Sequence, residues 1–342
     1  MLIQSIAGVD FRMKRPIYVF SSGDFRRKDN TLYIENENIK RYIPIETVSD
    51  VYLFGEVSLN TSLLDFLSRN EILVHYFNYY GYYSGTIYPR QHLASGEIII
   101  NQVKHYLDPQ LRLELAKQFV NGSIDNILRV LNYYNSRGKK VSDVIDNIKS
   151  FREQVDSTPD IESLMAIEGN AREVYYSSFN VIINEPTFKY DRRTRRPPAN
   201  PINALISFGN SVLYVSVLSE IYKTHLDARI GFLHASNFRR FSLNLDVAEI
   251  FKPIVVDRVI FTIVDRKELD EKHFEVGTEG TMLNQKGREI FLRNFEEKMS
   301  STINHKKLGR NVSYRRLIRM ELYKLEKHIL GDENYVPYVA QW

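Results

Sequence analysis

The strand pattern of Ile72-Leu73-Val74-His75-Tyr76-Phe77 and Tyr83-Ser84-Gly85-Thr86-Ile87-Tyr88 ends shortly before Gly96, where apolar residues begin to recur at helical spacing. Short β-branched and aromatic runs continue this strand pattern upstream to about residue 16. Downstream, helical spacing extends from about residue 111 to residue 329. The sequence therefore predicts an α+β multidomain chain. A small N-terminal β domain covers residues 1–95, a junction covers 96–108, and a larger all-α catalytic domain covers 109–342.

Composition excludes several classes of site. The 342 residues include no cysteine, which rules out disulfides, thiolate zinc sites and a cysteine nucleophile. The 46 basic and 42 acidic residues give a net charge of only +4, so local clustering matters more than the total. No signal peptide is evident, and no uninterrupted apolar run approaches the roughly 20 residues of a membrane span. We expect a soluble, cytoplasmic protein without a membrane partner.

Three separated stretches carry the residues of a candidate metal site. His234 ends Gly231-Phe232-Leu233-His234, just before a predicted helix that presents Asp246 and Glu249 three residues apart on one face. A third carboxylate, Glu168, lies in an upstream predicted helix. One imidazole and two or three carboxylates suit Mg²⁺ or Mn²⁺, and the imidazole tilts the balance toward Mn²⁺.

Each of these residues also has an ordinary structural interpretation. Glu168 could pair with Arg172 at i+4, an interaction worth a few tenths of a kcal/mol. Asp246 and Glu249 could favour the helix N-terminus, with Ser242 as an N-cap. That helix is apolar nearly all round, so at least one acid is expected to be partly buried and to need a cation or a metal. Pro253 should interrupt it.

Two basic clusters predict contacts with phosphate. The first is a proline-terminated loop with four arginines in five residues, Arg192, Arg193, Arg195 and Arg196. The arginine fork matches phosphate oxygens bidentately, which favours this interpretation over a solvated charge run. The second cluster runs from Lys306 to Lys327 and includes Arg315, Arg316 and Arg319; half of it could be a solvated helix face. No P-loop, dinucleotide fingerprint or Gly-x-Ser-x-Gly motif is present.

Taken together and in order, the motifs resemble one family, the CRISPR adaptation integrase. They are Phe54-Gly55-Glu56-Val57, Ile167-Glu168-Gly169, Arg195-Arg196-Pro197-Pro198 with Asn203-Ala204-Leu205, Gly231-Phe232-Leu233-His234 and Leu245-Asp246-Val247-Ala248-Glu249. The resemblance covers about Arg15 to the C-terminus. Residues 1 to about 12 depart from the pattern; an extension, an early start codon or an added segment would each account for them, and Met13 would be a natural start.

The resemblance implies a Mg²⁺- or Mn²⁺-dependent DNA endonuclease and integrase that inserts spacers into a CRISPR array. Its metal ligands fall on Glu168, His234 and Glu249, the last being Asp in many relatives. The neighbouring acid falls on Asp246, for which we expect an orienting role or a ligand role through water. The implied partners are double-stranded DNA, a second copy of the chain and the small second subunit of the integrase complex.

Two other functions fit the same residues. In a non-catalytic DNA-binding scaffold, the acids would serve as helix caps and ion pairs. A metal-dependent RNase would use the same ligands on a different nucleic acid. Loss of strand transfer in His234→Ala, and matched DNA and RNA substrates in Mn²⁺, separate these functions from the integrase.

Overall fold

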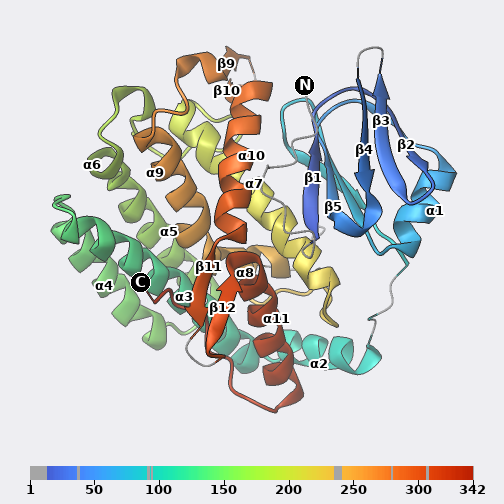
Figure 1. Cartoon of the computed structure of the whole chain (residues 1–342). Coiled ribbons are helices and arrows are strands. Elements are labelled where there is room, and N and C mark those ends of the chain that lie inside the picture. The colour runs from blue at the N-terminus through green and yellow to red at the C-terminus, as the bar shows by residue number, and fades with distance from the viewer. Residues whose placement is uncertain are drawn as a thin grey trace. The chain divides into compact units, whose positions relative to one another are not determined.

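The computed structural model describes residues 14–36, 39–90, 93, 95–234, 241–278, 280–305 and 308–341. The proposed N-terminal extension and Lys306 of the second basic cluster lie outside these residues. The chain divides into two compact units, Met1–His92 and Leu93–Trp342 (Figure 1). The first is built mainly from strands and the second mainly from helices, which confirms the predicted fold class.

The N-terminal unit contains two four-stranded sheets. In the first, β1 (Arg15–Val19), β5 (Val48–Leu53) and β7 (Leu73–Phe77) run parallel, and β8 (Tyr83–Ile87) joins β7 as an antiparallel edge. The second sheet has the order β4 (Ile39–Pro44), β3 (Thr31–Asn36), β2 (Gly23–Lys28) and β6 (Val57–Ser58). Helix α1 (Thr61–Arg69) begins at Asn60, whose side chain accepts a hydrogen bond from Leu63 N.

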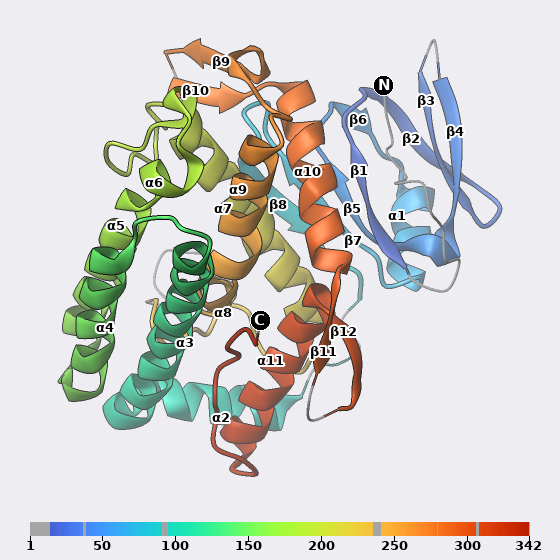
Figure 2. The ribbon, with the colours of Figure 1, turned by 60° about the vertical axis from the view of Figure 1, so that its left-hand side comes forward.

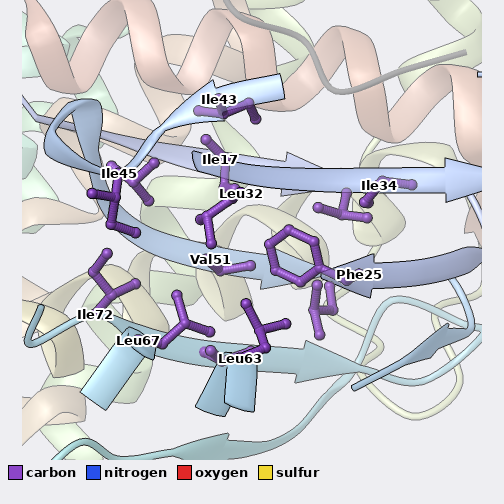
Figure 3. Close-up of a cluster of buried hydrophobic side chains, with 14 of the residues drawn as sticks. Ile17, Phe25, Leu32, Ile34, Ile43, Ile45, Val51, Leu63, Leu67 and Ile72 are labelled. Atoms are coloured by element: carbon purple, nitrogen blue, oxygen red, sulfur yellow. The ribbon is translucent and has the colours of Figure 1, made fainter. Parts of the chain in front are cut away.

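Both sheets and α1 contribute to one apolar core in this unit (Figure 3). Side chains alternate along each strand, so Ile17 and Val19 enter the core while Tyr18 lies on the other face of its sheet. On that other face, Tyr18, Tyr52 and His75 form a ladder with ring centroids 4.8 Å apart at each step. The alternation that predicted strands from sequence therefore also sorts the two faces.

The second unit is mostly helical. Its elements in chain order are α2 (Gly96–Leu107), α3 (Pro109–Ser136), α4 (Ser142–Ser157), α5 (Ile161–Ser177), α6 (Phe179–Ile183), η2 (Pro186–Phe188), α7 (Pro201–Tyr222), α8 (Leu243–Phe251), η3 (Pro253–Asp257), α9 (Arg258–Asp265), η4 (Glu271–His273), β9 (Phe274–Gly277), β10 (Gly280–Leu283), α10 (Gln285–Ser300), β11 (Thr302–His305), β12 (Arg310–Ser313) and α11 (Tyr314–Leu330). Two short hairpins, β9–β10 and β11–β12, are additions to the predicted all-α domain. The predicted junction, residues 96–108, contains all of α2.

Start signals in the sequence explain where the main helices begin. Asp108 and Asp160 cap α3 and α5 with their carboxylates, and Pro109 occupies the first turn of α3. Asn200 caps α7, which also has proline in its first turn. Pro253 ends the regular hydrogen bonding of α8, and the π-helical turn η3 follows, so the predicted interruption is confirmed.

Helix α7 forms the centre of the second unit. It is long and apolar enough to cross a membrane, but 83% of its most apolar window is buried within the fold, as in the core helix of a soluble protein. It packs against α8 and α11, and α8 also packs against α3, which in turn contacts α5 (Figure 2). This arrangement brings α5 and α8, which carry the predicted acids, to the same helix α3.

Candidate metal centre

His234 and Asp246 lie together in the structure, although twelve residues separate them in sequence. The Asp246 carboxylate, on the first turn of α8, is completely buried. Its Oδ2 accepts hydrogen bonds from the backbone N–H groups of Phe232 (2.5 Å) and Leu233 (3.0 Å). Its Oδ1 accepts from the His234 backbone N–H (2.9 Å) and lies 2.8 Å from Nδ1 of the same residue. One carboxylate therefore fixes both the backbone and the ring of His234.

The hydrogen bond to Asp246 selects the tautomer of His234. An acid beside Nδ1 keeps a proton there, which leaves Nε2 as the nitrogen that can bind a metal. Burial alone would lower the pKa of His234, but the hydrogen bond and charge of Asp246, with a smaller contribution from Glu249, raise it above its usual value. Such a carboxylate–histidine pair is the common support of a metal-binding imidazole.

Two further polar side chains hold the loop 227–234, which ends at His234. The sequence analysis did not predict either of them. Gln102 of α2 is fully buried; its Nε2 donates to the carbonyls of Asp227 (2.9 Å) and Ile230 (2.7 Å), and its Oε1 accepts from Asp227 N (2.9 Å). Arg112 of α3 donates from Nε to the Phe232 carbonyl at 2.9 Å. The sequence did contain a sign of this role. Gln102 is a polar residue four positions after Ile98, so it lies on the same buried face of α2.

Ser242 stabilises this loop and does not act as the predicted N-cap. No side-chain cap bond is made at the start of α8. Instead Ser242 Oγ donates to the Arg229 carbonyl and accepts from Gly231 N, both at 2.8 Å. A Cβ at Gly231 would lie 2.8 Å from Asp246 Oδ2, so only glycine allows this close approach.

Glu168 and Glu249 meet at the guanidinium of Arg172. On α5, Arg172 donates to Glu168 Oε1 from Nε (3.2 Å) and Nη2 (3.1 Å), which is the predicted i+4 ion pair. The same Nη2 donates to Glu249 Oε2 on α8 at 2.5 Å and to Ser123 Oγ on α3 at 2.9 Å. The ion pair thus exists, but it extends to the second acid and links three helices.

Glu249 carries a second cation on its other oxygen. Lys252 Nζ donates to Glu249 Oε1 and lies 4.9 Å from the centre of the Tyr214 ring. Burial alone would raise the pKa of Glu249, but the charges of Lys252, Arg172 and His234 together lower it to about 2. Glu249 is therefore ionised. Because the charge of His234 helps to lower the pKa of Glu249, the two side chains interact electrostatically.

A further buried acid lies beside this network. Burial raises the pKa of Asp257 to about 7, while the charge of Arg172 and the Tyr175 hydroxyl act in the opposite direction. Asp257 is at the end of the π-helical turn η3. Its electrostatic interaction with Arg172 gives it a share in the charge balance of the acids.

The donor set fits a hard divalent ion. Carboxylate oxygens and one imidazole nitrogen are ligands that Mg²⁺ and Mn²⁺ accept. Within the described ranges, no three His, Asp or Glu side chains are grouped to hold one ion directly. Glu168 and Glu249 converge on the Nη2 of Arg172 instead. The structure thus joins Glu168 to Glu249, and His234 to Asp246, with a cation between the two predicted acid ligands.

The predicted DNA-binding arginines divide into two groups. Arg193 is turned inward, with Nη1 donating to Asn203 Oδ1 and Nη2 to Ser207 Oγ, both at 2.9 Å. Its three neighbours in the loop, Arg192, Arg195 and Arg196, are exposed. Only these three can reach a ligand without breaking internal bonds.

The second cluster is divided in the same way. Arg315 donates from Nη2 to both carboxylate oxygens of Glu296 at 2.8 Å, and Arg319 Nε donates to buried Glu220 at 2.6 Å. Arg316 is exposed on the same helix. Charge clusters in sequence therefore overstate the cations available at the surface.

Comparison with known proteins gives a consistent family assignment. The family model described as CRISPR associated protein Cas1 matches residues 17–297. A CRISPR-associated endonuclease Cas1 from Thermodesulfovibrio yellowstonii is 54% identical, covering 96% of this chain and all of the relative. Another from Thermotoga maritima is 48% identical over 93% of this chain and 98% of the relative.

Solved structures give the same fold. A Cas1 protein from Thermotoga maritima matches with a TM-score of 0.86 and 45% identity, covering 95% of this chain and 99% of that one. A casposase bound to its integration product matches with a TM-score of 0.84 over 94% of this chain and 92% of that one. Its identity is only 16%, so this likeness concerns the fold alone.

Proposed function

The chain belongs to the Cas1 family of CRISPR-associated proteins, and we propose that it is a metal-dependent DNA endonuclease and integrase. It joins short foreign DNA segments, spacers, to a CRISPR array. The observation that carries this proposal is the pair of supports around the site: Asp246 orients His234, and one cation joins Glu168 to Glu249. Stable packing alone does not require a histidine whose tautomer is fixed next to two gathered acids.

The proposed ligands are Glu168, His234 and Glu249, with Mg²⁺ or Mn²⁺ as the ion. A bound ion would supply Lewis-acid polarisation of the scissile phosphate and stabilise its developing charge. Asp246 keeps the proton on Nδ1 of His234, so that Nε2 is directed to the ligand side. A DNA 3′-oxygen forms the new P–O bond, loses its proton, and the displaced strand leaves with its own 3′-hydroxyl. Water as nucleophile gives nicking instead.

We also propose the partners that this reaction needs. Double-stranded DNA supplies the protospacer and the array repeat. Relatives of the same fold have been solved as Cas6-RT-Cas1–Cas2 complexes, which favours a small second subunit of the Cas2 type for this chain. A homodimer would place two sites on the two ends of one spacer. The cytoplasm is the compartment where these partners meet.

Variants of the proposed ligands test the reaction against the non-catalytic scaffold. Glu168→Gln and His234→Ala should each abolish Mn²⁺-dependent strand transfer while DNA binding and folding are retained. Glu162→Gln, an exposed acid in the first turn of the same helix, is the matched control and should retain strand transfer. Undiminished strand transfer in both ligand variants would favour the scaffold. Cleavage of RNA in preference to matched DNA in Mn²⁺ would favour the RNase.

The exposed loop arginines are proposed to hold the DNA backbone without reading bases. Replacing Arg195 and Arg196 together by alanine should reduce the slope of log K against log salt by about 1.8, because each lost phosphate contact removes about 0.9. Alanine at Lys139 and Lys140, which connect α3 to α4, removes the same charge elsewhere and should leave the slope unchanged. If both double variants showed the same slope of log K against log salt, the loop arginines would not contact the DNA backbone.

A further inference from the structure

Arg172 occupies the point where the two predicted acid ligands meet. Its Nη2 lies 3.1 Å from Glu168 Oε1, 2.5 Å from Glu249 Oε2 and 2.9 Å from Ser123 Oγ. The Arg172 side chain is 9% exposed, so water does not share this point to any large extent. A single cationic nitrogen therefore holds two carboxylates from helices α5 and α8.

A divalent ion would need the same oxygens. Mg²⁺ binds carboxylate oxygens at about 2.0–2.1 Å, and an ion held by both acids would compete with Nη2 for Glu168 Oε1 and Glu249 Oε2, the oxygens that now accept its hydrogen bonds. A guanidinium nitrogen and a divalent ion cannot both occupy this gap, because their atoms would overlap and their charges repel in a buried setting. Arginine and ion are alternatives at this position.

We propose that Arg172 is a placeholder cation that gathers and neutralises Glu168 and Glu249 before the divalent ion binds, and that its Nη2 leaves when the ion enters. The inference depends on the proposed metal site and adds a residue that prepares it. Without a cation, two acids brought together in a buried site would repel each other and resist convergence. With Arg172 in place, the fold can assemble the site in the absence of metal.

The surroundings give the guanidinium somewhere to go. Its Nη1 is buried and has no hydrogen-bond partner among the residues that the structure describes. The carboxylate of Asp257 is close enough to act on the charge of Arg172 and is not one of the proposed ligands. When Nη2 leaves Glu249, the unbonded Nη1 and the nearby charge of Asp257 would favour a rotation of the guanidinium away from the two ligands.

Lys252 does not have the geometry for this role. It contacts one of the two acids, Glu249, through the oxygen that does not face Arg172, and its ammonium lies over the Tyr214 ring. A departing Lys252 would leave Glu168 still paired with Arg172. The gathering of two ligands depends on Arg172 alone among the described cations of this network.

The direct test measures Mn²⁺ affinity by calorimetry and by the electron paramagnetic resonance of free Mn²⁺. Arg172→Met keeps the aliphatic chain and removes the competing charge, so Mn²⁺ should bind at least about tenfold more tightly. The variant should also melt at a lower temperature in EDTA and gain more from added Mn²⁺ than the wild type. Arg293→Met, which breaks the 2.8 Å ion pair with Glu268 away from the site, should leave Mn²⁺ affinity unchanged.

The outcomes separate the two proposals. No Mn²⁺ binding by either wild type or Arg172→Met would overturn the metal site and the placeholder together. Binding by the wild type with equal or weaker binding by Arg172→Met would overturn the placeholder alone.

A second measurement needs no variant. Crystals of the wild-type chain soaked in Mn²⁺ should show anomalous density between Glu168 and Glu249, with Arg172 Nη2 separated from at least one of the two. An ion held by these acids while both Nη2 contacts stay within hydrogen-bond distance would overturn the placeholder, even if Arg172→Met fails to fold.

Discussion

His234 and Glu249 are both held in buried surroundings, but by partners of opposite kinds. An acid, Asp246, holds His234, whereas two cations, Arg172 and Lys252, hold Glu249. On the histidine side, defined by His234, Asp246 and residues 227–234, the described hydrogen bonds fix the backbone and Nδ1 of His234, so that Nε2 is the nitrogen directed to a ligand. On the acid side, defined by Glu168, Arg172, Glu249 and Lys252, the ligand oxygens are already paired.

The difference indicates how a charged site can fold before its ion arrives. His234 can be fixed in advance because the buried Asp246 carboxylate is its partner, and the hydrogen bond and charge of that acid raise the pKa of the ring. Two carboxylates cannot be gathered in a buried place unless positive charge accompanies them. The histidine side is therefore rigid by construction, and the acid side must exchange one cation for another. The following variants test this contrast, beginning with the largest expected effect.

Glu249→Gln should be the most destabilising change on the acid side. It leaves the buried cations Arg172 and Lys252 without their shared carboxylate, which should cost about 3–5 kcal/mol of unfolding free energy. Glu168→Gln should cost only about 0.5 kcal/mol, because Glu168 is more exposed and its bond is an i+4 pair. Urea unfolding in EDTA measures both. Equal losses of unfolding free energy in the two variants would contradict the view that buried cations depend more on Glu249 than on Glu168.

Asp246→Asn tests the histidine side. In either orientation the amide NH2 group of asparagine would face N–H donors, those of Phe232 and Leu233 or that of His234, and leave them unpaired at a cost of about 3 kcal/mol. Metal affinity should fall about 10–100-fold through misorientation of His234. His234→Ala should unfold much less readily than Asp246→Asn, since it leaves the three backbone bonds in place. If His234→Ala were the less stable of the two, the carboxylate would act through the ring and not through the backbone.

Gln102→Leu tests whether the loop is rigid because of its support from α2. Leucine fills a similar volume but leaves the Asp227 N–H and two loop carbonyls unpaired, which should cost about 2 kcal/mol of stability. Strand transfer should slow because His234 is less firmly placed. Exposed Gln110 is the control, and its change to leucine should stay within about 0.5 kcal/mol. Variants of equal stability would show that Asp246, Ser242 and Arg112 hold the loop without Gln102.

These contrasts also mark what the sequence could and could not predict. Local rules predicted the strand region and the break at Pro253, because each depends on neighbouring residues. The i, i+3 spacing of Asp246 and Glu249 predicted a shared face. It could not predict that the two acids would have different partners, since those partners come from distant elements.

Most features that the sequence did not predict depend on contacts between distant residues. Arg172 and Glu249 are 77 positions apart, and Gln102 and Asp227 are 125 apart, so no window of sequence contains either pair. The clustering of Arg315 and Arg319 predicted a DNA surface, but their acids, Glu296 and Glu220, lie on other helices. The hairpins β9–β10 and β11–β12 were missed because four-residue strands carry too little periodicity.

Asp257→Asn tests the charge balance around Arg172. It should change the free energy of unfolding less than the variants above, and only through its dependence on pH. With its pKa raised to about 7 by burial, Asp257 holds a proton in the folded chain that the unfolded chain loses near its ordinary pKa of 3.8. Its contribution to stability is therefore complete below about pH 4 and is lost as pH rises toward 7, by up to about 1.4 kcal/mol per pH unit. Asparagine cannot ionise and removes this slope.

The measurement is urea unfolding of wild type and Asp257→Asn in EDTA between about pH 5 and about pH 8. The difference between the two curves isolates Asp257, because His234 titrates in both proteins. A protonated Asp257 leaves Arg172 and Lys252 matched one for one by Glu168 and Glu249, so the acid side is neutral before metal enters. A difference that does not change with pH would mean that Asp257 is ionised throughout, and the acid side together with Asp257 would then carry a net negative charge.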